Sequence, residues 1–196
     1  MLLEYFYECI LSILVENQPS MLTRIVGLLT RRGFNIESLA VGSTEYESLS
    51  RLVVVLPGNL RTIDQVSRQL YKLFSVVKVY NLTHVPCIKR ELILLKILVT
   101  EIERQKVLEI ANVFNANIVD CTNKTVTLEI TGDSEKVVAV EQMLNKFGIL
   151  EKIRTGKVGL SCESLVGGQI YTVSHDNLRR RMVNYHIREI EGKMYL

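Results

Sequence analysis

The sequence predicts an α+β fold made of two tandem units, each with the element order βαββαβ. The first observation is that one succession of apolar strand-like and amphipathic helix-like segments occurs twice along the 196 residues. The second is that the apolar positions of one predicted helix return 74 positions later, where Ile63, Val66, Leu70 and Leu73 are matched by Val137, Val140, Leu144 and Phe147. Because any amphipathic helix shows such a spacing, two unrelated α+β segments could share it by chance. The agreement of the whole element order favours a repeat.

The first unit opens with a strand and a helix. Residues 9–15 are rich in β-branched residues and leucine, which is typical of a strand. Asn17-Gln18-Pro19-Ser20 then offers helix N-caps and a proline suited to a first helical turn. The helix that follows is predicted by an apolar stripe at Leu22, Ile25, Val26 and Leu29. Gly33 is suited to its left-handed C-terminal cap.

A hairpin, a second helix and a closing strand complete the first unit. Strands are predicted over 34–41 and 49–56, joined by the polar turn 42–48. The second helix carries the repeated apolar positions given above, with Asp64, Arg68 and Lys72 on its solvent side, and residues 75–81 form the last strand. The order βαββαβ is that of ferredoxin-like domains, in which two helices cover one face of a four-stranded antiparallel sheet.

The second unit repeats this order after a break at Pro86. We predict a strand over 92–99, short strands over 117–120 and 149–153, and a half-buried strand where Val126, Leu128 and Ile130 alternate with polar residues. A helix stripe is predicted at Val107, Ile110, Ala111 and Phe114. The expected organisation is a first domain at 8–82, a linker at 83–90, a second domain at 91–165 and an extra tail of unknown structure at 166–196.

Composition and charge exclude several classes of protein. A net charge of +3 does not indicate a nucleic-acid partner, and no uncharged apolar run approaches the length of a membrane helix. The four cysteines are isolated, which favours a reducing compartment and gives neither a metal site nor a redox motif. Without a secretion signal or a transit peptide, we expect a cytoplasmic protein, or one of the plastid stroma if a plastid genome encodes it.

No catalytic residues are predicted in this chain. The histidines are His84, His175 and His186, and none lies in a context that suggests a nucleophile or a triad. Glycine-rich phosphate-binding motifs are missing. The strand predicted over 49–56 contains no aromatic residue on which RNA bases could stack, and the loop after the first strand has no cysteine pair for a soft metal. Three arginines, 179–181, are interpreted as a solvated face.

The loop before the first helix is the one candidate binding site. The predicted strand is followed by the predicted helix at residues 17–22. Backbone N–H groups and the positive end of the helix dipole are therefore expected to point outward, where a small carboxylate could bind. Asn35, after the other end of the helix, offers both a donor and an acceptor, as an amino acid requires. Taken singly, Asn17 is better explained as a helix cap and Asn35 as a turn or the start of a strand.

These segments also carry a family resemblance. Asn17-Gln18-Pro19-Ser20-Met21-Leu22-Thr23-Arg24 and Arg31-Arg32-Gly33-Phe34-Asn35-Ile36-Glu37-Ser38-Leu39 closely resemble the regulatory (small) subunit of acetolactate synthase, also called acetohydroxyacid synthase. The resemblance continues through Leu49-Ser50-Arg51, Gln69-Leu70-Tyr71-Lys72-Leu73, Arg90-Glu91-Leu92-Ile93-Leu94-Leu95-Lys96 and Gly156-Lys157-Val158-Gly159-Leu160-Ser161. It covers roughly residues 8–165.

The resemblance implies an N-terminal ACT domain, a second domain of related fold and no catalysis by this chain. Such subunits form homodimers, activate a catalytic (large) subunit that uses thiamine diphosphate, Mg²⁺ and usually FAD, and impose feedback inhibition by valine in branched-chain amino acid biosynthesis. By resemblance, Asn17 and the backbone of Ser20, Met21 and Leu22 bind the effector from one protomer, while Asn35 and Ile36 reach it from the other. Ser20 departs from the glycine that the family usually has there. The tail from Gly167 onward exceeds the usual family length.

A different class of function stays open from the residues alone. A free-standing ACT protein that senses an amino acid and controls another partner would carry the same loop. An enzymatic reading would require this chain to convert pyruvate without a catalytic subunit, and we expect no such turnover.

Overall fold

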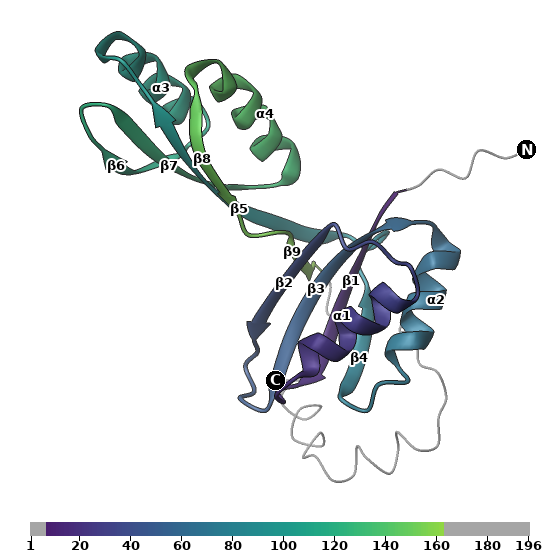
Figure 1. Ribbon diagram of the computed structural model, residues 1–196. Coiled ribbons are helices and arrows are strands. Elements are labelled where there is room, and N and C mark those ends of the chain that lie inside the picture. The colour runs from purple at the N-terminus through teal and green to yellow at the C-terminus, as the bar shows by residue number, and fades with distance from the viewer. Residues whose placement is uncertain (1–6, 163–196) are drawn as a thin grey trace, which may run out of the picture.

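A computed structural model describes residues 7–162, which form two α+β domains joined by a long strand, β5 (Figure 1). In each domain, two helices lie on one face of an antiparallel sheet. The predicted fold class, two tandem ferredoxin-like domains, is confirmed. The predicted tail at 166–196 lies outside the described residues.

The first domain has its strands in the order β2-β3-β1-β4. Its elements are β1 (Tyr7–Glu16), α1 (Met21–Arg31), β2 (Ser38–Ser43), β3 (Leu49–Gly58), α2 (Leu60–Leu70) and β4 (Val76–Asn81). The two central strands, β1 and β3, pair along ten residues, from Tyr7 opposite Gly58 to Glu16 opposite Leu49. Strands β2 and β4 form the two edges of this sheet.

The second domain repeats that topology in the order β6-β7-β5-β8. Its elements are β5 (Cys87–Leu98), α3 (Glu101–Val113), β6 (Asn117–Cys121), β7 (Thr125–Gly132), α4 (Ser134–Leu144), a 3₁₀ turn (Asn145–Phe147) and β8 (Ile149–Arg154). A further strand, β9 (Val158–Ser161), leaves this domain and pairs with the first residues of β5.

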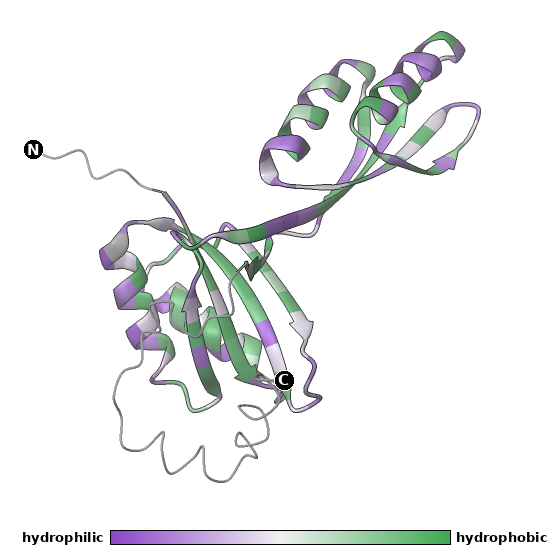
Figure 2. Cartoon of the chain, turned by 180° about the vertical axis from the view of Figure 1, so that it is seen from behind, coloured by the Kyte–Doolittle hydropathy of each residue, from purple (hydrophilic) through white to green (hydrophobic). Residues whose placement is uncertain are grey.

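Each domain encloses its own apolar core between the helices and the sheet. In the first, Leu11, Ile13, Ile25, Leu52 and Val66 are among the fully buried side chains. In the second, alternate residues of β5 and β7 meet the inward faces of α3 and α4, with Ile93, Leu95, Leu128, Val140 and Leu144 completely buried. Figure 2 shows apolar residues concentrated along the strands and on parts of the helices. The alternation of apolar and polar residues therefore sets which strand face is buried.

The start of the first domain differs from the prediction in three details. The strand expected from residue 34 begins at Ser38. Phe34 and Ile36, which alternate as strand residues would, instead pack against the core from the loop after α1. Pro19 precedes the helix rather than occupying its first turn, and Leu22, expected in the apolar stripe, is 40% exposed, while Met21 takes the buried position.

Only the first part of the segment expected to be a linker, 83–90, lies outside the strands. Residues from Cys87 onward already belong to β5, where Cys87–Arg90 pair with β9. The inner side of this β5–β9 ribbon covers the sheet face of the first domain that lacks helices: Cys87 packs on the buried cluster of Ile10, Val53, Val55 and Leu82. The first residue of β5, a central strand of the second domain, thus packs against the first domain.

Candidate effector site and domain junction

The turn between β1 and α1 holds an unusual backbone conformation. Ser20, immediately before the helix, has φ 64° and ψ 4°, which is the left-handed region. Residues other than glycine, asparagine and aspartate rarely adopt this region, because their Cβ atom crowds the backbone. Glycine, which has no Cβ atom, would adopt this φ angle without that cost.

The same turn leaves the start of α1 open. The Ser20 side chain forms no capping hydrogen bond, and the first turn contains no acidic residue. Met21 N–H donates to Gln18 O at 3.3 Å and Arg24 N–H to Ser20 O at 3.1 Å, but within residues 7–162 nothing accepts from the N–H groups of Leu22 and Thr23. Two donors at the positive end of a helix dipole are suited to bind a carboxylate.

The predicted site residues around this turn differ in whether their side chains are exposed or buried. Asn17, Ser20 and Leu22 are exposed, whereas the Met21 side chain is buried in the core, so Met21 has only its backbone to offer. Asn17 does not cap the helix: its Nδ2 donates to Glu47 O at 3.4 Å, and its N–H donates to Ser48 O at 2.8 Å. Within residues 7–162, the side-chain oxygen of Asn17 accepts no hydrogen bond.

Asn35 and Ile36 lie at the other end of α1. The chain leaves the helix through Gly33, whose φ of 75° fits the predicted left-handed cap, and Asn35 is exposed while Ile36 is half-buried against the core. Since α1 has 11 residues, its ends are about 16 Å apart. One chain therefore does not bring Asn35 and Ile36 to Ser20. An amino acid that touched both groups would have to lie between two copies of the chain.

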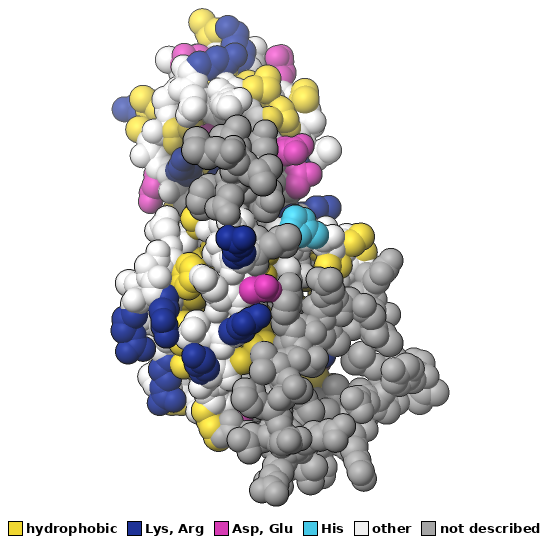
Figure 3. Space-filling view, turned by 90° about the vertical axis from the view of Figure 1, so that its right-hand side faces the viewer, with side chains coloured by type: hydrophobic (Ala, Val, Ile, Leu, Met, Phe, Trp, Pro, Cys, Tyr) yellow, Lys and Arg dark blue, Asp and Glu magenta, His cyan; other side chains and the backbone are white. Residues whose placement is uncertain are grey.

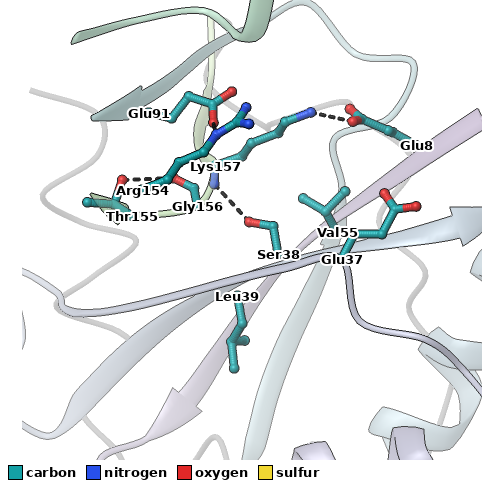
Figure 4. A pocket seen from close by; sticks show the side chains of 10 residues that line it. All are labelled: Glu8, Glu37, Ser38, Leu39, Val55, Glu91, Arg154, Thr155, Gly156 and Lys157. Atoms are coloured by element: carbon teal, nitrogen blue, oxygen red, sulfur yellow. Dashed lines mark hydrogen bonds and ion pairs between the residues drawn. The ribbon is translucent and has the colours of Figure 1, made fainter. Parts of the chain in front are cut away.

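A polar cavity of about 440 Å³ lies where the two domains meet (Figure 4). Glu37 and Ser38 line it from the first domain, and Glu91, Arg154 and Lys157 from the second. The Lys157 ammonium forms an ion pair with Glu8 of β1, and Arg154 forms one with Glu91. The opposite charges of this junction are thus largely paired with each other.

Glu91 is the buried charge of the junction, with 3% of its surface exposed. It accepts hydrogen bonds from Arg154 and from Ser134, the first residue of α4. Burial by itself would raise the pKa of Glu91, but these hydrogen bonds and the positive charges of Arg154 and Lys157 outweigh it and lower the pKa below its ordinary value. Glu91 is therefore ionised at neutral pH.

The junction residues were not predicted as a site, although the sequence carries one signal for them. Ile93, Leu95 and Ile97 are buried on one face of β5, and Glu91 falls on the same odd-numbered face. A carboxylate at a buried position of a strand needs a partner, and the position of Glu91 in the alternation could have indicated one. The identity of that partner, 63 residues further along the chain, depends on the fold.

The described residues include a buried thiol. Cys9 lies in the apolar core, where burial, reinforced by the charge of Glu37, raises the pKa of its thiol. Within residues 7–162, no three His, Cys, Asp or Glu side chains lie together in a way that could bind a metal ion. In the same part of the chain, no helix has the length and apolar character needed to cross a membrane.

Comparison with known proteins identifies the family. The model for the "AHAS small subunit-like ACT domain" matches residues 11–78, and the model for the "Small subunit of acetolactate synthase" matches residues 90–163. A relative from Methanothermobacter thermautotrophicus, named "Probable acetolactate synthase small subunit", is 42% identical over 153 residues, which are 78% of this chain and 91% of that protein. The chain belongs to the acetolactate synthase small-subunit family.

Two further members of this family also match most of this chain. The Arabidopsis thaliana protein named "Acetolactate synthase small subunit 2, chloroplastic" is 47% identical over 154 residues, which are 79% of this chain but only 32% of that longer protein. The crystal structure of the acetolactate synthase small subunit from Thermotoga maritima superposes with a TM-score of 0.75 at 35% identity, covering 81% of this chain and 99% of that one. The two-domain architecture is therefore that of an acetolactate synthase small subunit.

Proposed function

We propose that this chain is a regulatory subunit of acetolactate synthase that activates a catalytic subunit and makes it sensitive to valine. Membership in the small-subunit family supports the partnership, and thiamine diphosphate, Mg²⁺ and FAD would belong to the catalytic subunit. The chain would act in the compartment of that subunit, a bacterial cytoplasm or a plastid stroma. A tenfold effect of valine on activity requires only about 1.4 kcal/mol of differential binding to two arrangements of the complex.

The observation that carries the effector role is the uncapped start of α1. The N–H groups of Leu22 and Thr23 would bind the carboxylate of valine, and the exposed Asn17 would bind its ammonium group through the side-chain oxygen. The second half of the site, Asn35 and Ile36, would come from the partner protomer of a homodimer, because α1 separates the two halves within one chain. Ile36 would contribute apolar contact to the valine side chain.

Calorimetric titration of L-valine into the purified chain, with leucine and isoleucine as comparators, tests the effector site. We expect saturable valine binding that is lost in Asn35→Ala. It should be kept in Asn112→Ala, because Asn112 is an exposed asparagine on α3 in the other domain. Equal binding by both variants would contradict the assignment of Asn35.

Reconstitution with an acetolactate synthase catalytic subunit tests the partnership. We expect the chain to raise the rate of acetolactate formation and valine to reverse that rise. Valine binding without any effect on a catalytic subunit would favour the rival function, a free-standing ACT sensor that acts on another partner.

A further inference from the structure

The connection between β8 and β9 crosses from the second domain onto the first. Lys157 donates its backbone N–H to Ser38 Oγ at 2.9 Å, and Ser38 is the first residue of β2 (Figure 4). The preceding Gly156 has φ 87°, and a Cβ atom there would lie 2.6 Å from the same Ser38 oxygen. Only glycine therefore allows the backbone of this connection to approach Ser38 so closely.

The same connection is fixed to the second domain by several bonds. Thr155 N–H donates to Leu92 O at 3.1 Å, and Leu92 N–H donates to Thr155 Oγ1 at 3.1 Å. Arg154 pairs with the buried Glu91, which also accepts from Ser134 of α4. An unbroken series of bonded groups thus leads from α4, through Glu91 and the connection, to the start of β2.

Ser38 lies close in the chain to one half of the effector site. It follows Ile36 by two residues, and the residue between them, Glu37, donates its N–H to Val55 O at 2.9 Å. The loop from Gly33 to Glu37 belongs to no regular element: Phe34 and Ile36 pack against the core, and the end of the loop is held by the Glu37–Val55 bond and by the start of β2. A shift of Ser38 would therefore move Asn35 and Ile36 relative to a bound amino acid.

We propose that Ser38 is a positioning residue through which the second domain controls the effector site. The Lys157 N–H holds Ser38, Ser38 fixes the loop that carries Asn35 and Ile36, and valine binding in turn is transmitted to the second domain through the same bond. This inference rests on the proposed function, because it assigns the regulation of that site. The Lys157–Glu8 ion pair is less suited to this role, since Glu8 is half exposed and exposed pairs contribute little.

Amide hydrogen exchange of the full-length chain, measured by NMR, tests this proposal at the bond concerned. We expect valine to slow exchange of the Lys157 amide in the unsubstituted protein. Ser38→Ala should weaken valine binding about fivefold, the equivalent of one hydrogen bond of roughly 1 kcal/mol, and abolish the protection of Lys157 by valine. Ser38→Thr keeps the oxygen and should restore both properties. Ser43→Ala, at the exposed end of the same strand, should leave both unchanged.

The outcomes distinguish failure of the effector site from failure of the Ser38–Lys157 coupling. If the unsubstituted chain binds no valine, the proposed function fails and this inference falls with it. If the chain binds valine while exchange of Lys157 is unaffected, the inference is overturned and the proposed function stands, even if Ser38→Ala cannot be purified in folded form. Equal valine affinity of Ser38→Ala and the unsubstituted protein would also overturn the inference.

Discussion

Ser20 shows how one residue combines a stability cost with a binding geometry. Its left-handed backbone leads into α1, where the N–H groups of Leu22 and Thr23 have no acceptor within residues 7–162, and glycine would adopt the same turn without a Cβ atom. The serine in this chain adds a hydroxyl beside the predicted carboxylate position. The backbone, rather than the Ser20 side chain, thus sets the geometry of the proposed binding turn.

We predict that Ser20→Gly stabilises the folded chain by about 1 kcal/mol, because it relieves a left-handed serine. Urea unfolding would measure the change. Asn115 has φ 49° and is the matched control: asparagine tolerates this conformation better than serine, so Asn115→Gly should give a smaller gain. A loss of stability in Ser20→Gly would show that the serine hydroxyl makes a contact that outweighs the strain.

Glu91 gives the domain junction a dependence on pH. Because hydrogen bonds and charges lower its pKa in the folded state, ionised Glu91 stabilises the fold above the pKa of the unfolded chain, about 4.3. This stabilisation is lost as the pH falls from there through the lower pKa of the folded state. The junction should therefore weaken in acid.

We predict that Glu91→Gln lowers the free energy of unfolding by about 2 kcal/mol at pH 7, with a smaller difference from the unsubstituted protein near pH 3. Urea unfolding at both pH values checks this. Glu151→Gln replaces an exposed carboxylate of β8 and should change little at either pH. A penalty for Glu91→Gln that is the same at both pH values would contradict the ionic role of Glu91.

At the scale of single elements, the helices differ in how they begin. Thr100 and Glu103 form a reciprocal capping box at the start of α3, and the Thr100 hydrogen bonds lower the pKa of Glu103. Asn59 and Thr62 form the corresponding box at α2. The start of α1 has no such cap. The one uncapped N-terminus of these three is the one for which we propose a ligand.

Thr100→Ala is expected to destabilise the second domain by about 1 kcal/mol, the usual cost of losing an N-cap. Thermal unfolding followed by circular dichroism would detect it. Thr30→Ala, at an exposed position late in α1, is the control and should change stability by less than about 0.5 kcal/mol. If both variants unfold alike, the capping box contributes no stability.

The elements that sequence patterns predicted are those with a local cause. Alternation on Val126, Leu128 and Ile130 and the stripes on α2 and α4 follow from burial of one face, so both domains could be predicted. The strand β9 could not, because its four residues pair with a strand about 70 positions earlier. In the site, the turn at Ser20 has local signals, whereas the Ser38–Lys157 bond spans 119 positions and needs the fold.

At the scale of the whole molecule, the predicted effector site is shared between chains. A mixed dimer of one Asn17→Ala chain and one Asn35→Ala chain would have one site with both asparagines intact and one site with both missing. We predict that such a heterodimer binds about half as much valine per dimer as the unsubstituted protein, although each variant alone binds none. Calorimetry on differently tagged, co-purified chains measures this stoichiometry. Absence of binding in the mixed dimer would place Asn17 and Asn35 in the same chain's site.

The return of β9 to the first residues of β5 means that the chain passes between the domains twice. A protease that cut the chain just before β5 would therefore break the polypeptide without releasing either half, because Cys87 would stay packed on Ile10, Val53 and Val55, and Lys157 would stay bonded to Ser38 and Glu8. A nicked molecule should migrate as one particle under native conditions and as two fragments only after denaturation. Cleavage of the chain at this point therefore does not separate the folded molecule into two parts.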